Sequence, residues 1–198
     1  MEPGLRLWLV RHGQTAWNAS GLCLGRTDLP LNQFGRETVL ALKNRIDINA
    51  CDVIYCSPSK RALETARILI QGHSKPIRIS RDLQEINFGT WEGKSWQYIT
   101  ENRYKEWIMW KQDPLHSAPY GGESLEDVAE RMARLYRVLQ EGHEGQTLET
   151  EDLLSQTVLV SKTEVMETAT HDRKKGGRQW QHEAYGRDIS NSVWSRFP

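Results

Sequence analysis

The chain has 198 residues, a length that suits one domain with a substantial buried core. Its 26 basic and 26 acidic side chains balance, so the charge of the whole protein gives no reason to expect a nucleic-acid or acidic-membrane partner. No run approaches the roughly 20 apolar residues of a membrane span, and three cysteines without metal-ligand or redox spacing indicate a reduced, cytoplasmic protein.

The first predicted element is a buried strand over residues 5–10, which ends abruptly at Arg11, His12 and Gly13. In open α/β sheets, ligands bind where strands end at their carboxyl edge, so the guanidinium and the imidazole are expected at the mouth of a site. An imidazole is a fair nucleophile at neutral pH, and a guanidinium offers a planar fork that matches phosphate oxygens. The pair therefore suits phosphoryl chemistry, although so short a motif also occurs by chance.

A loop over residues 18–30 follows and is expected to lie over the end of that strand. Asn18 could donate an amide hydrogen bond to a bound oxyanion, or could be an ordinary loop residue. After the loop, Asn32 is predicted to cap a helix that runs to about Ile46.

A second buried strand is predicted over residues 52–56, after which Ser57 and Pro58 start a helix that ends near Gly72. Arg61 lies in the first turn of that helix, beside free backbone N–H groups and the positive end of the helix dipole. A cation is locally unfavourable there, which is more easily understood if the guanidinium binds an anion. A solvated surface arginine is the alternative.

A third strand is predicted over residues 77–83, and Glu85 follows it closely. A carboxylic acid at this place could protonate a leaving-group oxygen if burial raised its pKa, whereas an isolated glutamate is usually just exposed. Residues 95–111 are predicted to be helical, and their tryptophans are expected to pack on the core or to roof a pocket.

The clearest helix begins at a capping box formed by Ser124 and Asp127. A polar, acidic connection over residues 142–156 leads to a buried strand over residues 157–161. Residues 162–198 contain only five aliphatic or phenylalanine side chains and are expected to be weakly packed or disordered; these five are Val165, Met166, Ile189, Val193 and Phe197.

Together these motifs resemble the histidine phosphatases, also called the phosphoglycerate mutase-like family. The resemblance rests on five stretches in the same order, at residues 9–18, 25–31, 57–66, 83–93 and 121–128. It is closer to the phosphatase branch, which includes α-ribazole phosphatases and fructose-2,6-bisphosphatase-like enzymes, than to the mutases. It implies a three-layer α/β/α fold with a mostly parallel sheet over residues 1–161.

The resemblance also implies a mechanism. His12 would attack the phosphoryl group and become a phosphohistidine, while Arg11 and Arg61 clamp the phosphate oxygens with help from Asn18. Glu85 would give a proton to the leaving alcohol and then activate water. The implied enzyme is a phosphomonoesterase that needs no metal or other cofactor and acts on a small phosphate ester.

The resemblance ends after the strand over residues 157–161. Family members continue with a second histidine and a glycine, whereas this chain has Lys162 and Thr163. Lys162 would still bind phosphate as a point charge, on a longer and more flexible stem. His171 and His182 are not at the matching position and are not expected to replace the histidine. The alternative function is therefore a catalytically inactive phosphate-binding or interaction protein, or a variant product altered by a frame slip or splice.

Overall fold

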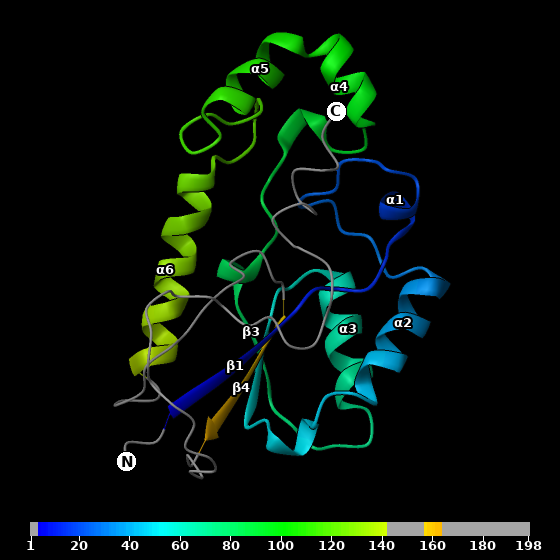
Figure 1. Cartoon of the computed structure of the whole chain (residues 1–198), viewed down its shortest axis with the longest axis vertical. Helices are drawn as coiled ribbons and strands as arrows, with labels where there is room; N and C mark the ends of the chain where they lie inside the picture. Colours follow the sequence, from blue (N-terminus) through cyan, green and yellow to red (C-terminus); the bar gives the residue numbers. More distant parts are fainter. Residues whose placement is uncertain (1–3, 142–156, 164–198) are drawn as a thin grey trace, which may run out of the picture. The chain divides into compact units, whose positions relative to one another are not determined.

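The computed structural model describes residues 4–141 and 157–163 (Figure 1). All of these residues belong to one compact unit, which is bounded by Met1 and Val165. The predictions made for the connection 142–156 and for His171 and His182, and most of those for residues 162–198, lie outside the described residues.

The longer helices and the strands follow the predicted order, with two helices in place of one over residues 95–111. The bounds of the described elements are β1 (Gly4–Val10), α1 (Ala16–Ala19), α2 (Gln33–Lys43), η1 (Ile48–Ala50), β2 (Val53–Cys56), α3 (Lys60–Ile70), β3 (Ile77–Ile79), η2 (Arg81–Leu83), η3 (Gly89–Trp91), α4 (Trp96–Asn102), α5 (Tyr104–Gln112), α6 (Leu125–Glu141) and β4 (Thr157–Thr163), where η marks a short 3-10 helix. No helix in this part of the chain has the length and apolar character needed to cross a membrane. The short helix α1 and the 3-10 helices were not predicted. The helix predicted to start at Ser57 begins at Lys60, with Ser59 at its N-cap position, and the strand predicted over residues 77–83 ends at Ile79.

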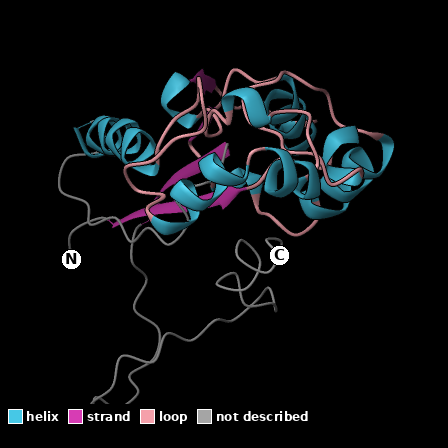
Figure 2. Cartoon of the chain, turned by 90° about the horizontal axis from the view of Figure 1, so that it is seen from above, coloured by secondary structure: helices cyan, strands magenta, loops and turns pink. Residues whose placement is uncertain are grey.

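Apolar side chains alternate along the two strands that carry most of the core, and this alternation builds three layers. One set packs against α2 and α3, and its members on β1 and β2 are Trp8, Val10, Ile54 and Cys56. The side chains that alternate with these point to the other face and pack against α6. Their members on β1 and β2 are Leu7, Leu9, Val53 and Tyr55. The strands accordingly lie between α6 on one side and α2 and α3 on the other (Figure 1), and Figure 2 shows them among the surrounding helices.

The sheet has the strand order β1-β4-β2-β3. β2 and β3 are parallel, with Ile54 opposite Ile77, but β4 runs antiparallel to both β1 and β2. The α/β fold is confirmed, whereas two of the three described pairings are antiparallel where a mostly parallel sheet was predicted. The reason is that a short, buried apolar run has the same pattern in either direction, so the sequence does not fix which way such a strand runs.

The tryptophans of α4 and α5 form an aromatic cluster around Trp91, which is 0% exposed. Ring centroids lie 6.4 Å from Trp91 to Trp96, 6.1 Å to Trp107 and 5.9 Å to Trp110. Such tilted and edge-to-face arrangements are the favoured ones for aromatic pairs. The tryptophans therefore form a core of their own beneath α4 and α5.

Replacing Ile54 by alanine is expected to lower the free energy of unfolding by about 2–5 kcal/mol, because it leaves a cavity in the larger core. Ile79 provides a matched control, since it lies on the neighbouring strand and is 53% exposed whereas Ile54 is 0% exposed. Ile79→Ala is expected to cost about 1 kcal/mol or less. Urea unfolding followed by tryptophan fluorescence measures both, and equal losses would contradict this placement of the core.

Candidate active site

The end of β1 is held against α2 by a close approach of two glycines. A Cβ atom on Gly13 would lie 2.7 Å from the carbonyl oxygen of Gly35 and 2.8 Å from Val39 Cγ2. Only glycine fits such a contact without displacing the backbone of α2. This packing fixes the turn that carries His12, which is 8% exposed, while Arg11 beside it is exposed.

The His12 imidazole is oriented by its own backbone. Its Nδ1 lies 2.7 Å from the carbonyl oxygen of Gly13. Because a carbonyl can only accept a hydrogen bond, this contact places the proton on Nδ1 and the lone pair on Nε2. Burial lowers the pKa of His12 to about 4; the bond to Gly13 opposes this shift, and the positive charges of Arg61 and Arg11 add to it. The imidazole is therefore neutral at pH 7, with a free lone pair on Nε2.

Arg61 is buried, with 1% of its surface exposed. Its Nη1 donates to the carbonyl oxygen of Thr27 at 2.9 Å, and its Nη2 donates to that of Gly25 at 2.6 Å. Its Nε is buried and has no hydrogen-bond partner among the described residues. Burial lowers the pKa of Arg61, which the carboxylate of Glu85 opposes. A solvated surface arginine is thus excluded, and an N–H group remains for an anion.

Thr65 joins the backbone of His12 to that of Arg61. The N–H of Gly13 donates to Thr65 Oγ1 at 3.1 Å, and this hydroxyl donates to the carbonyl oxygen of Arg61 at 2.8 Å. Sequence reasoning missed this role. The available signal was the spacing of four residues between Arg61 and Thr65, which places both on one face of α3.

Asn18 acts as part of a helix cap. Its Oδ1 accepts from the backbone N–H of Thr15 at 3.0 Å and from Thr15 Oγ1 at 2.9 Å, and its own N–H donates back to that hydroxyl at 3.3 Å. These bonds fix the side-chain amide through its oxygen. The amide nitrogen is the part of Asn18 that can donate to an oxyanion.

Glu85 is half-buried, and its Oε1 accepts from the N–H of Ile86 at 3.1 Å. Its negative charge acts on both Arg61 and Arg131, raising the pKa of each against the lowering effect of burial. The structure therefore brings Glu85 into the neighbourhood of Arg61, as a site for proton transfer to a bound phosphate ester requires.

Glu123 fixes the segment that follows Glu85. Its Oε2 accepts from the backbone N–H of Asn87 at 2.9 Å. The same carboxylate pairs with Arg26 and, at 3.5 Å, with Arg131 of α6. Sequence reasoning gave Glu123 no role, although it lies inside the family motif over residues 121–128.

The register of β4 separates Lys162 from His12. Thr157 is opposite Val10, at the end of β1 that leads to His12, and Lys162 is opposite Leu5. Five residues of strand correspond to roughly 16 Å. The role of Lys162 in the phosphate pocket therefore stays a prediction, and this register does not favour it, because only parallel strands bring their carboxyl ends to the same edge.

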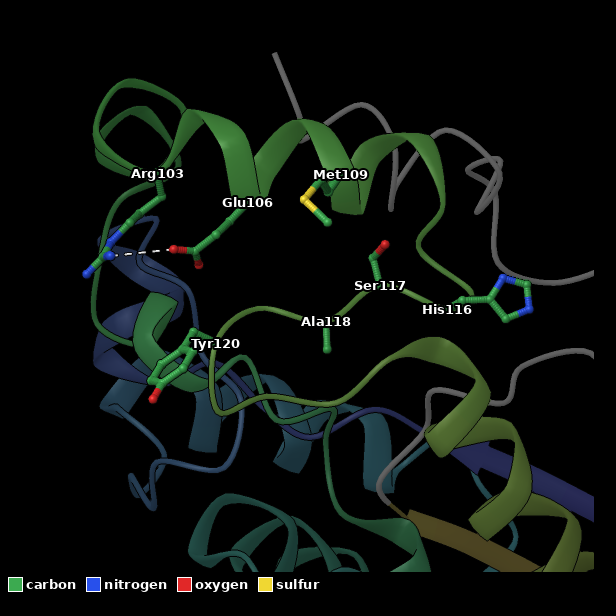
Figure 3. A pocket seen from close by; sticks show the side chains of 7 residues that line it. All are labelled: Arg103, Glu106, Met109, His116, Ser117, Ala118 and Tyr120. Atoms are coloured by element: carbon green, nitrogen blue, oxygen red, sulfur yellow. Dashed lines mark hydrogen bonds and ion pairs between the residues drawn. The ribbon is translucent and has the colours of Figure 1, made fainter.

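A surface cavity of about 650 Å³ lies between α5 and the segment that follows it (Figure 3). It is lined by Arg103, Glu106, Met109, His116, Ser117, Ala118 and Tyr120. Two of these side chains, Arg103 and Glu106, form an ion pair at 3.4 Å. None of the residues predicted to bind phosphate or to act in catalysis lines this cavity.

Comparison with known proteins gives consistent matches. A family model described as the histidine phosphatase superfamily (branch 1) matches residues 7–176. The chain is 31% identical over 137 residues to an adenosylcobalamin/alpha-ribazole phosphatase of Escherichia coli, a match that covers 69% of this chain and 68% of the relative. It is 34% identical over 134 residues to a glucosyl-3-phosphoglycerate phosphatase of Mycolicibacterium vanbaalenii, with coverages of 68% and 59%.

The solved structures agree. An alpha-ribazole phosphatase from Shigella flexneri has a TM-score of 0.64 and 29% sequence identity, and the match covers 71% of each chain. The chain spans about two thirds of the length of its alpha-ribazole phosphatase relative from Escherichia coli.

We expect the Cε1–H resonance of His12 to titrate in NMR spectra with a pKa near 4. The folded protein keeps His12 neutral, whereas the unfolded chain takes up a proton below about pH 6.5. The free energy of unfolding should therefore fall as pH drops from about 6.5 to about 4, by about 3 kcal/mol in total from this group.

The control is His12→Gln, which removes this titration and leaves the other groups in place. Urea unfolding at pH 7 and pH 4.5 should show a steeper loss of stability for the parent protein than for the variant. Equal losses, or a His12 pKa near the ordinary value, would contradict the burial described for His12.

Proposed function

Because the chain belongs to the histidine phosphatase superfamily, branch 1, we propose that it is a metal-independent phosphomonoesterase that acts through a phosphohistidine at His12. The hydrolytic class of the enzyme follows from the family and from the phosphatase names of its relatives. The observation that carries the mechanism is the neutral, oriented imidazole of His12 close to the buried cation of Arg61.

In the first step, the Nε2 lone pair of His12 attacks phosphorus and the bond from phosphorus to the leaving oxygen breaks. Glu85, as the carboxylic acid, gives its proton to that oxygen, so that an alcohol leaves. The phosphorylated imidazole carries positive charge, which the carbonyl oxygen of Gly13 at Nδ1 stabilises. Covalent catalysis of this kind divides one difficult displacement into two easier ones.

In the second step, the Glu85 carboxylate takes a proton from water as the water oxygen attacks phosphorus. The phosphorus–nitrogen bond breaks, its electron pair returns to Nε2, and inorganic phosphate leaves. Glu85 ends the cycle protonated and His12 neutral, as both began.

Arg61, Arg11 and the amide nitrogen of Asn18 bind the phosphoryl oxygens in this proposal. Fixed donors of this kind stabilise the charge of the transferring group without reorganisation during the step. The buried Nε of Arg61 supports its part, because an unpaired buried N–H group is costly unless a ligand satisfies it.

The substrate in this proposal is a small-molecule phosphate ester. Two relatives are named for alpha-ribazole and for glucosyl-3-phosphoglycerate, so their names support the reaction class more than any one substrate. The cytoplasmic location inferred from the cysteines stays a prediction.

A second function, phosphate binding without turnover, is favoured by one observation. The family's second histidine is replaced by Lys162, and the register of β4 places this residue opposite Leu5. The described site therefore relies on His12, Arg61 and Glu85 without a cation from β4.

The purified protein is expected to release phosphate from an aryl phosphate in EDTA, and His12→Ala is expected to lose at least roughly 10³-fold in kcat/KM. The variant also controls for contaminating phosphatases. If both proteins are equally inactive while the parent unfolds cooperatively, binding without turnover becomes the better description.

Glu85→Gln tests the proton donor in the same assay. A phenolate leaves readily without a proton, whereas an alkoxide needs one. The variant should therefore lose more kcat on an alkyl phosphate than on an aryl phosphate. Equal losses on both substrates would remove Glu85 from the role of general acid.

Lys162→Ala is expected to change kcat/KM little, because β4 places this residue at the other end of β1 from His12. If Lys162 instead lay in the phosphate pocket, Lys162→Ala would lower kcat/KM by a factor approaching the roughly 10²–10³-fold typical of a missing transition-state donor. Steady-state kinetics on an aryl phosphate distinguishes the two. Thermal unfolding of both proteins controls for an effect on folding.

A further inference from the structure

The buried guanidinium of Arg61 is held by one loop, residues 25–27. Both of its described hydrogen bonds go to carbonyl oxygens of this loop, those of Gly25 and Thr27. Carbonyl groups turn with the backbone that carries them, so the conformation of the loop sets the position of the cation. Whatever holds the loop therefore also holds Arg61.

We propose that Glu92 is a positioning residue for Arg61, which it holds in place through the loop 25–27. The inference rests on the proposed function, in which Arg61 binds the transferring phosphoryl group. Glu92 itself needs no contact with the phosphate.

One carboxylate collects four donors in this arrangement. Glu92 Oε1 accepts from the backbone N–H of Arg26 at 2.7 Å and from that of Phe88 at 3.2 Å. Glu92 Oε2 accepts from the backbone N–H of Thr27 at 2.7 Å and also from the hydroxyl of Thr27. Hydrogen bonds to a charged acceptor are stronger than neutral ones, so this group is well suited to fix a loop.

The fit at Gly25 shows how closely the loop lies on the segment that carries Glu92. A Cβ atom at Gly25 would overlap Glu92 Oε1, and would lie 2.5 Å from the carbonyl oxygen of Ile86 and 2.9 Å from the N–H of Phe88. A shift of Glu92 or of Phe88 therefore moves Gly25 directly. Since the carbonyl of Gly25 binds Arg61 Nη2, the shift reaches the guanidinium in one step.

A glutamine at position 92 would turn one acceptor oxygen into an NH2 donor. Either the bonds from the backbone N–H groups of Arg26 and Phe88, or the bond from the backbone N–H of Thr27, would then be lost, because two donors would face each other. The loop would shift, and Arg61 with it. Misplacing a catalytic group by about 1 Å can cost roughly 100-fold in rate.

Glu92→Gln is expected to lower kcat on an aryl phosphate by roughly 10- to 100-fold. Glu64→Gln is the matched control, since Glu64 also accepts a backbone N–H, that of Leu31 at 2.9 Å, and pairs with Arg36. Glu64 makes no described contact with the carbonyls that hold Arg61, so kcat of Glu64→Gln should stay near that of the parent.

A double-mutant cycle separates positioning from general damage. In an Arg61→Lys background the forked contact with the two carbonyls is absent, so Glu92→Gln should lower kcat far less than in the parent. If Glu92→Gln lowers kcat in the Arg61→Lys background by the same factor as in the parent, the proposal is overturned. Thr27→Val, which removes only the hydroxyl bond to Glu92, should give a smaller loss in the same direction and serves if Glu92→Gln fails to fold.

A spectroscopic readout tests the positioning without any turnover. The Nε–H resonance of Arg61 is identified by its disappearance in Arg61→Lys. It should shift in Glu92→Gln and in Thr27→Val, and stay in place in Glu64→Gln. An unshifted resonance in both Glu92→Gln and Thr27→Val overturns the proposal. Absence of phosphatase activity beyond that of His12→Ala would overturn the proposed function instead, and the resonance still decides whether Glu92 positions Arg61.

Discussion

A guanidinium that is buried away from water needs fixed hydrogen-bond acceptors, and this requirement organises the site around Arg61. Burying an ion costs several kcal/mol even after the surroundings relax. The carbonyls of Gly25 and Thr27 offset that cost by accepting from both Nη atoms. The loop that follows α1 and the start of α3 are thereby held together.

The same burial gives His12 its chemistry. Excluding water from the imidazole disfavours its charged form, and the nearby positive charges act in the same direction. The carbonyl of Gly13 then fixes the tautomer. Because Thr65 bonds both to the N–H of Gly13 and to the carbonyl of Arg61, the turn that carries His12 and the cation of Arg61 share one anchor on α3.

The direction of β4 distinguishes this chain from the arrangement that its motifs imply. An antiparallel strand next to β1 places its first residue, Thr157, at the edge where His12 lies, and places Lys162 at the other. The groups proposed for catalysis thus lie in the turn after β1, on α3 and in the segment after η2. In the proposed mechanism, each missing donor weakens transition-state stabilisation without removing the nucleophile.

Local patterns in the sequence determined much of the fold and pointed to the residues proposed for the site. The strand before Arg11, the cap at Asn32 and the capping box of Ser124 with Asp127 are all present as predicted. His12, Arg61 and Glu85 were predicted as site residues because each follows a strand or begins a helix at positions where the backbone geometry favours a ligand. These features depend on residues a few places apart in the chain.

Only the tertiary structure decided the contacts between distant segments. The bonds of Arg61 reach back 34 and 36 residues to Thr27 and Gly25, and those of Glu92 span 65 and 66 residues to Thr27 and Arg26. Neither set of hydrogen bonds leaves a periodic pattern in the sequence, because a carbonyl or a backbone N–H is present at nearly every residue. The direction of β4 was likewise set by its pairing partners, since hydrophobicity marks a strand as buried but carries no information about which way it runs.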